Sequence, residues 1–84
     1  MIPVLRIFVT EHCPGCIEAQ QIAIWAAENY THLKVELIDM NAPEAVVPEV
    51  VFAAPTYMLN DRIVSLGNPS RAEVVEWVKK AVAQ

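Results

Sequence analysis

The sequence is poor in basic residues. Of its 84 residues only 6 are Lys or Arg, against 10 Asp or Glu, and the net charge is −4. Domains that bind nucleic acid usually carry a basic stripe on one face. The basic residues here are scattered along the chain, apart from Lys79 and Lys80 near its end. We therefore expect no nucleic-acid partner.

Long hydrophobic runs are also missing. Hydrophobic residues make up 55% of the chain, but no stretch reaches the roughly 18 apolar residues that a membrane span needs. The opening stretch MIPVLRIFVT lacks a charged leader region and a cleavage site, and Arg6 interrupts its apolar run. These features predict a cytoplasmic protein with no membrane partner. The short length predicts a single domain over residues 1–84, and we expect a monomer.

Cysteine is scarce, and both cysteines lie in the stretch TEHCPGC. A structural zinc site usually has four ligands, of which Cys13 and Cys16 would supply two. His12 adjoins Cys13 and His32 lies far along the chain, so neither completes a site well. We expect no metal site within one chain. A redox-active dithiol is the main interpretation, and a non-enzymatic dimer that binds a metal or an iron–sulfur cluster through Cys13 is the alternative.

Hydrophobic periodicity predicts one α/β domain with the element order β-α-β-α-β-β-α. The expected elements lie at residues 4–10, 14–30, 33–40, 41–52, 55–60, 62–66 and 70–83. The fourth, between Pro43 and Pro48, is expected to be one short, broken helix.

These elements predict a four-stranded mixed sheet flanked by three helices on its two faces. A right-handed crossover makes the first two strands parallel, and the turn formers Asn60 and Asp61 predict an antiparallel hairpin. Ser70 and Glu73 have the spacing of a capping box at the start of the last helix. Trp25 falls among polar positions of the first helix, and we expect it to be partly buried.

The dithiol is expected where the first strand ends and the first helix begins. A thiol at a helix N-terminus meets unpaired amides and the positive end of the helix dipole, which favour the thiolate. Pro14 suits the first helical position, so the amides of Gly15 and Cys16 are expected to point at the Cys13 sulfur. We expect Cys13 to be the exposed nucleophile. Cys16, on the inner face, is expected to resolve the mixed disulfide.

Three features resemble the thioredoxin-like superfamily over nearly the whole chain: CPGC after a strand, APT before the hairpin, and Gly67 before the last helix. The resemblance implies a thioredoxin fold and a thiol–disulfide oxidoreductase. Its redox-active centre is then the Cys13–Cys16 disulfide, with no bound cofactor. It also implies that Pro55 is cis, packs beside the dithiol and turns the backbone of Ala54 toward a substrate strand. The expected substrate-binding residues are Pro14, Gly15, Ala54, Pro55 and Gly67.

Two branches of this superfamily compete. Thioredoxins reduce protein disulfides with electrons from a flavoprotein reductase, whereas glutaredoxins use glutathione. The short length and Pro14 resemble glutaredoxin, whereas residues 53–78 and the stretch TEHCPGC resemble thioredoxin. The glutaredoxin lysine is Thr10 here, and GNPS replaces the residues that hold glutathione's γ-glutamyl end. We expect disulfide-containing proteins as substrates, and a thioredoxin reductase or glutathione as electron donor.

One departure from the thioredoxin pattern concerns proton transfer. The buried aspartate of thioredoxins, six residues before the first cysteine, is Ile7 here. Without that carboxylate, the proton acceptor for Cys16 is expected to be water or a neighbour such as Glu11 or His12. A positive charge on His12 would also stabilise the Cys13 thiolate. Glu11 and His12 are therefore the expected modulators of the cysteine pKa values.

Overall fold

A computed structural model describes residues 2–82 of the chain, and within them four strands and two helices. In chain order these are β1 (Val4–Val9), α1 (Cys16–Asn29), β2 (Lys34–Asp39), β3 (Thr56–Leu59), β4 (Arg62–Leu66) and α2 (Arg71–Val82). Each lies within two residues of an element predicted from the sequence. Residue 83, the predicted end of the last helix, lies outside the described residues.

The strands form one mixed sheet in the order β2-β1-β3-β4. β1 pairs with β2 in parallel, from Val4 opposite Lys34 to Val9 opposite Asp39. β3 and β4 pair with each other as an antiparallel hairpin, and β3 also pairs with β1 in antiparallel. Asn60, in the hairpin turn, has a φ of 56°, a left-handed conformation that asparagine tolerates well. The predicted four-stranded mixed sheet is confirmed.

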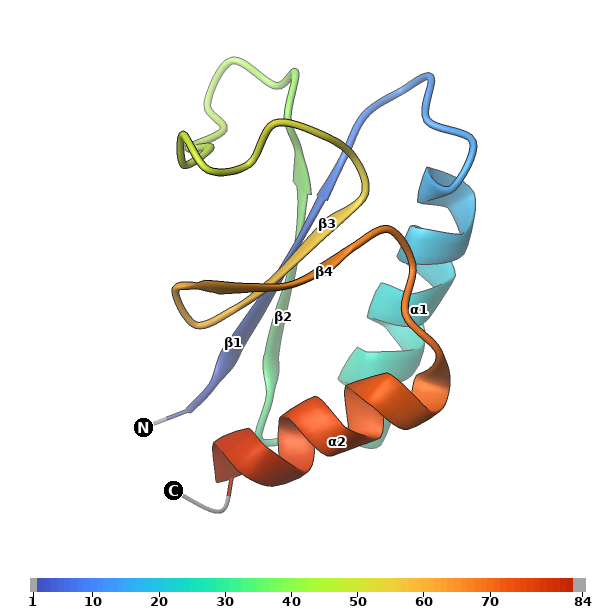
Figure 1. The fold of residues 1–84 in the computed structure, drawn as a ribbon, viewed down its shortest axis with the longest axis vertical. Helices are drawn as coiled ribbons and strands as arrows, with labels where there is room; N and C mark the ends of the chain where they lie inside the picture. The colour runs from blue at the N-terminus through green and yellow to red at the C-terminus, as the bar shows by residue number, and fades with distance from the viewer. Residues whose placement is uncertain (1, 83–84) are drawn as a thin grey trace.

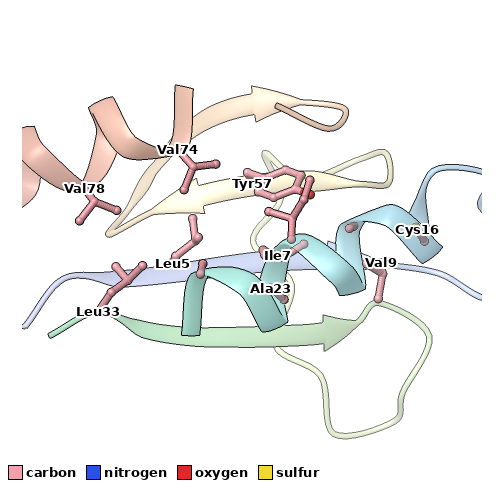
Figure 2. Packing of buried hydrophobic residues seen from close by; sticks show 12 residues of the cluster. Leu5, Ile7, Val9, Cys16, Ala23, Leu33, Tyr57, Val74 and Val78 are labelled. Atoms are coloured by element: carbon pink, nitrogen blue, oxygen red, sulfur yellow. The ribbon is translucent and has the colours of Figure 1, made fainter. Parts of the chain in front are cut away.

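Both helices cover the same face of the sheet (Figure 1). We call this face the helix side. In Figure 2, side chains of β1 and β3 point from the sheet toward those of α1 and α2. This core is formed by Leu5, Ile7, Val9, Cys16, Ala19, Ile22, Ala23, Ala26, Leu33, Tyr57, Val74 and Val78. The alternating strand residues and the apolar stripe of each helix meet here, as their periodicities require.

Of the three predicted helices, the one at residues 41–52 is absent, so within residues 2–82 the second face of the sheet carries no helix. Residues 40–55 instead form turns and irregular chain over that face, which we call the loop side. Pro43 and Pro48 remove backbone donors, and the short interval between them offers too few hydrogen bonds to offset helix nucleation. The segment is anchored by a smaller cluster of Phe8, Val51 and Met58.

Helix α2 is fixed at its start and along its length. The Glu73 N–H donates to Ser70 Oγ at 3.1 Å, and the Ser70 N–H donates to Glu73 Oε1 at 3.0 Å, so the capping box is confirmed. The Arg71 guanidinium lies 5.2 Å from the ring centroid of Trp25, which also packs edge-on against Tyr30. Trp25 is partly buried, as expected.

Neither helix combines the length and the apolar character needed to cross a bilayer.

Candidate active site

A disulfide joins Cys13 and Cys16 at the junction of β1 and α1, with their Cα atoms 5.2 Å apart. Cys13 lies in the turn before the helix and is partly exposed, whereas Cys16 is the first residue of α1 and is only 3% exposed. The two sulfur atoms therefore differ in access from solvent. The predicted roles of an outer nucleophile and an inner resolving thiol require such a difference, and the roles themselves stay predictions.

The spacer between the cysteines forms one tight turn. Helix α1 begins at Cys16 with Gly15 as its N-cap, so the prediction that Pro14 occupies the first helical position is wrong. The Cys16 N–H donates to the Cys13 carbonyl at 3.1 Å, so this amide does not point at the Cys13 sulfur as predicted. The Gly15 carbonyl accepts the Ala19 N–H at 3.1 Å, which starts the helical ladder. Backbone bonds thus hold both ends of the spacer.

Pro55 packs against this spacer. The Ala54–Pro55 peptide bond is cis, as the family resemblance implied. A Cβ added to Gly15 would lie 3.6 Å from Pro55 Cδ, so the ring is in contact with the turn. The Pro55 carbonyl accepts the Gly67 N–H at 2.8 Å, which brings the loop after β4 to the same place. Among residues 2–82, neither the N–H nor the carbonyl of Ala54 is hydrogen-bonded.

Two further side chains reach the spacer, and the sequence did not indicate them. Asn68 Nδ2 donates to the Gly15 carbonyl at 2.8 Å, and the Tyr57 hydroxyl lies 2.7 Å from Asn68 Oδ1. In the sequence, Asn68 stands out only as part of GNPS, the stretch between the hairpin and the last helix. Its partners lie 53 and 11 residues away in the chain, at distances that no short motif encodes. Its position next to Gly67, a predicted site residue, is the one feature of the sequence that places it near the site.

Tyr57 lies beside Ile7, the residue that stands where thioredoxins have a buried aspartate. It pairs with Ile7 across β1 and β3, and both side chains are fully buried. Burial raises the pKa of Tyr57 far above its usual value, the Glu18 carboxylate raises it further, and the Arg71 guanidinium lowers it. The phenol therefore stays protonated and cannot accept the Cys16 proton.

The two predicted modulators, Glu11 and His12, are exposed in the turn before Cys13. Within residues 2–82 neither side chain forms a hydrogen bond or an ion pair. Their influence on the cysteines stays a prediction. Within the same residues, no group of three or more His, Cys, Asp or Glu side chains is arranged to hold a metal ion.

Solved structures with the same fold include several thioredoxins. Thioredoxin f from spinach chloroplast superimposes with a TM-score of 0.75 at 17% identity, covering 96% of this chain and 71% of that one. Oxidised thioredoxin O2 from Arabidopsis thaliana gives 0.71 at 13% identity, covering 94% and 74%. A thioredoxin-like protein from Bacillus cereus gives 0.59 at 20% identity, covering 95% and 87%. At these identities the likeness establishes the fold alone.

A comparison with curated protein sequences found no match. A family model described as a thioredoxin domain matches residues 4–79, which include the dithiol, the cis proline and most of α2. The match spans nearly the whole chain and agrees with the geometry of the site. The chain belongs to the thioredoxin-domain family, and its Cys13–Cys16 pair is a redox centre of the thiol–disulfide oxidoreductase type.

Proposed function

We propose that this protein reduces disulfide bonds in other proteins through the Cys13–Cys16 pair. The observation that carries the proposal is the disulfide at the start of α1, with a partly exposed outer sulfur and a buried inner one. Only the outer sulfur is open to a partner as large as a protein. The inner sulfur is protected from external disulfides and has Cys13 as its partner.

The reaction begins from the reduced pair. The Cys13 thiolate attacks one sulfur of the substrate disulfide, which forms a mixed disulfide and releases the first substrate thiolate. The Cys16 thiolate then attacks the Cys13 sulfur, releasing the second substrate thiolate and closing the Cys13–Cys16 disulfide. The two electrons gained by the substrate come from the two cysteines. The proton of each cysteine passes to water or to a released thiolate.

The backbone beside the dithiol supports a protein substrate. Ala54 is partly exposed and follows the exposed segment that ends at Ala53. Its unpaired N–H and carbonyl can hydrogen-bond to an extended substrate segment, as in β-strand addition. Phe52, two residues earlier, is 77% exposed and offers apolar contact on the same approach. We propose that Ala54 and Pro55 position the substrate next to Cys13.

The electron donor we propose is a flavoprotein reductase of the thioredoxin type. Glutathione is the less favoured donor because the residues that would hold its γ-glutamyl end are changed. Both polar atoms of the Asn68 side chain are engaged with Gly15 and Tyr57, and Pro69 has no N–H to offer. Thr10 stands where glutaredoxins have a lysine and supplies no positive charge.

Trapping with Cys16→Ser tests the proposed reaction. Because this variant lacks the resolving thiol, it should hold disulfide-containing proteins as stable mixed disulfides on Cys13, visible as adducts that dithiothreitol removes. The control is Cys13→Ser, which should trap none because its remaining thiol is buried. The wild-type protein should reduce insulin disulfides with dithiothreitol as donor. Absence of adducts, together with no insulin reduction, would refute the proposal.

A second assay separates the two donors. NADPH consumption is followed with catalytic amounts of the protein, insulin as the disulfide substrate, and either thioredoxin reductase or glutathione plus glutathione reductase. We expect turnover with thioredoxin reductase to be at least tenfold faster. Faster turnover with glutathione would show that the protein acts as a glutaredoxin.

A further inference from the structure

A two-step chain of side-chain hydrogen bonds ends on the backbone between the two cysteines. Tyr57 comes from β3, Asn68 from the loop after β4, and Gly15 from the spacer itself. The Tyr57 oxygen lies 2.7 Å from Asn68 Oδ1, and Asn68 Nδ2 lies 2.8 Å from the Gly15 carbonyl oxygen. Three segments that are distant in the sequence are thus connected through one amide.

The direction of both bonds is fixed by chemistry. The Gly15 carbonyl can only accept, so the amide nitrogen of Asn68 must face it and donate. The amide oxygen then faces Tyr57, and the phenol must donate its proton to it. The buried hydroxyl keeps that proton, since burial raises the pKa of Tyr57. Each of the two linked hydrogen bonds therefore joins a donor to an acceptor.

The fit around Gly15 shows how closely the amide is seated. A Cβ on this residue would lie 3.0 Å from Asn68 Nδ2, closer than ordinary contact. The φ of Gly15 is −86°, which any residue adopts, so glycine is favoured here by the space beside Asn68 and not by its backbone conformation. The neighbouring Gly67 N–H also holds the Pro55 carbonyl, at 2.8 Å. Residues 67 and 68 together join the spacer to the cis proline.

We propose that Asn68, held in place by Tyr57, is a positioning residue that fixes the Cys13–Cys16 turn and so stabilises the disulfide relative to the dithiol. The proposal rests on the proposed function in that it concerns the same redox pair. Closing the disulfide requires the Cys16 sulfur to meet the Cys13 sulfur, and a held spacer keeps the two near each other before the bond forms. A loose spacer raises the conformational entropy of the dithiol form and so lowers the equilibrium constant for closing the Cys13–Cys16 disulfide.

The stability of the Cys13–Cys16 disulfide is set by its exchange with glutathione, an equilibrium that needs no protein substrate. The protein disulfide and two molecules of glutathione exchange to give the protein dithiol and one molecule of oxidised glutathione, so thiols and disulfides balance on the two sides. Two electrons pass from glutathione to the Cys13–Cys16 pair. The network acts on this equilibrium by changing the freedom of the dithiol form.

The test is the equilibrium constant of the Cys13–Cys16 pair in buffers of reduced and oxidised glutathione, read by alkylation of free thiols and mass spectrometry. Asn68→Ala removes both bonds, and we expect the disulfide to become roughly 3- to 10-fold easier to reduce, as the loss of a hydrogen bond predicts. Asn68→Asp keeps an acceptor for Tyr57 but loses the donor to Gly15, and should shift the equilibrium at least as far. Tyr57→Phe keeps the Asn68–Gly15 bond but loses its anchor, so a smaller shift in the same direction is expected.

Asn29→Ala is the matched control. Asn29 Nδ2 also donates to a backbone carbonyl at 2.8 Å, that of Trp25, but at the far end of α1. It should leave the redox equilibrium within twofold of wild type. If Asn68→Ala also stays within twofold, or if the disulfide becomes harder to reduce, the proposal is wrong. If Asn68→Ala does not fold, Tyr57→Phe decides, and an unchanged equilibrium in that variant overturns the proposal.

This experiment stands apart from the proposed function. A protein that traps no substrate still has a Cys13–Cys16 equilibrium that the network either shifts or does not. Conversely, a variant with normal equilibrium and normal substrate trapping would refute only the role of Asn68.

Discussion

The helix side and the loop side of the sheet bury very different amounts of the chain. On the helix side, strand residues and two helices form one continuous core, whereas the loop side has a cluster of three buried residues under an irregular segment. That segment also leaves apolar side chains in solvent, at 84%, 56% and 77% exposed for Val46, Val50 and Phe52. Most of the site is thus built on the face that the helices cover, whereas Ala54 and Pro55 come from the end of the loop segment. The dithiol, Tyr57 and the start of α2 all belong to the helix side.

The largest expected effect comes from deleting buried side chains on the two faces. Ile22, in α1, is fully buried on the helix side, and Met58 is 4% exposed on the loop side. We expect Ile22→Ala to lower the free energy of unfolding by about 4 kcal/mol and Met58→Ala by about 2 kcal/mol. The loop can collapse into the space left by Met58, whereas the helix holds its place. Urea unfolding followed by circular dichroism measures both.

A milder substitution at the same position keeps the comparison measurable if Ile22→Ala does not fold. Ile22→Val removes one methylene and should cost about 1 kcal/mol. If Met58→Ala proved as costly as Ile22→Ala, the loop side would be as tightly packed as the helix side and the contrast would fail.

A moderate effect is expected at the cap of α2, which has no counterpart in the loop segment. Ser70→Ala removes the acceptor of the Glu73 N–H and should destabilise the protein by about 1 kcal/mol. Glu73→Gln keeps a side-chain acceptor for the Ser70 N–H and should cost less. Both are measured by urea unfolding. Equal losses in the two variants would mean that the charge of Glu73 contributes as much to the stability of the helix as the Ser70 cap.

The smallest effect is expected at Phe52. Because its ring is 77% exposed, Phe52→Ser should change the free energy of unfolding by less than about 0.5 kcal/mol. Thermal unfolding is sufficient to check this. A loss above about 1 kcal/mol would show that the ring packs on the loop side and that the exposed surface is smaller than described.

The parts of the fold that the sequence predicted well are those with a repeating physical signal. Residues of β1 alternate between two buried faces, and α1 carries an apolar stripe at helical spacing, so both were placed within two residues. The helix at 41–52 was predicted wrongly because the sequence there has signals for the start of a helix but no sustained apolar stripe at helical spacing. Two prolines and several valines, which lower helix propensity, decide its structure.

The candidate site was predictable to the extent that local motifs encode it. Cys13 and Cys16 were found because spacing and position act together, and Pro55 was found through a family resemblance. Asn68 and Tyr57 were missed, since a hydrogen bond between distant segments depends on how those segments are packed. The position of Gly15 N-terminal to the helix was also missed, because the spacer closes a turn of its own before α1 begins.

The close approach of Gly15 and Asn68 has an evolutionary consequence. With an amide 3.0 Å from where a Cβ would stand, a larger residue at position 15 requires the side chain at position 68 to shift or to be smaller. The two positions should therefore covary among relatives, with a larger spacer residue accompanied by a small residue at the second position. A spacer grafted from a relative into this protein is then expected to fit best when the residue at position 68 is transferred with it.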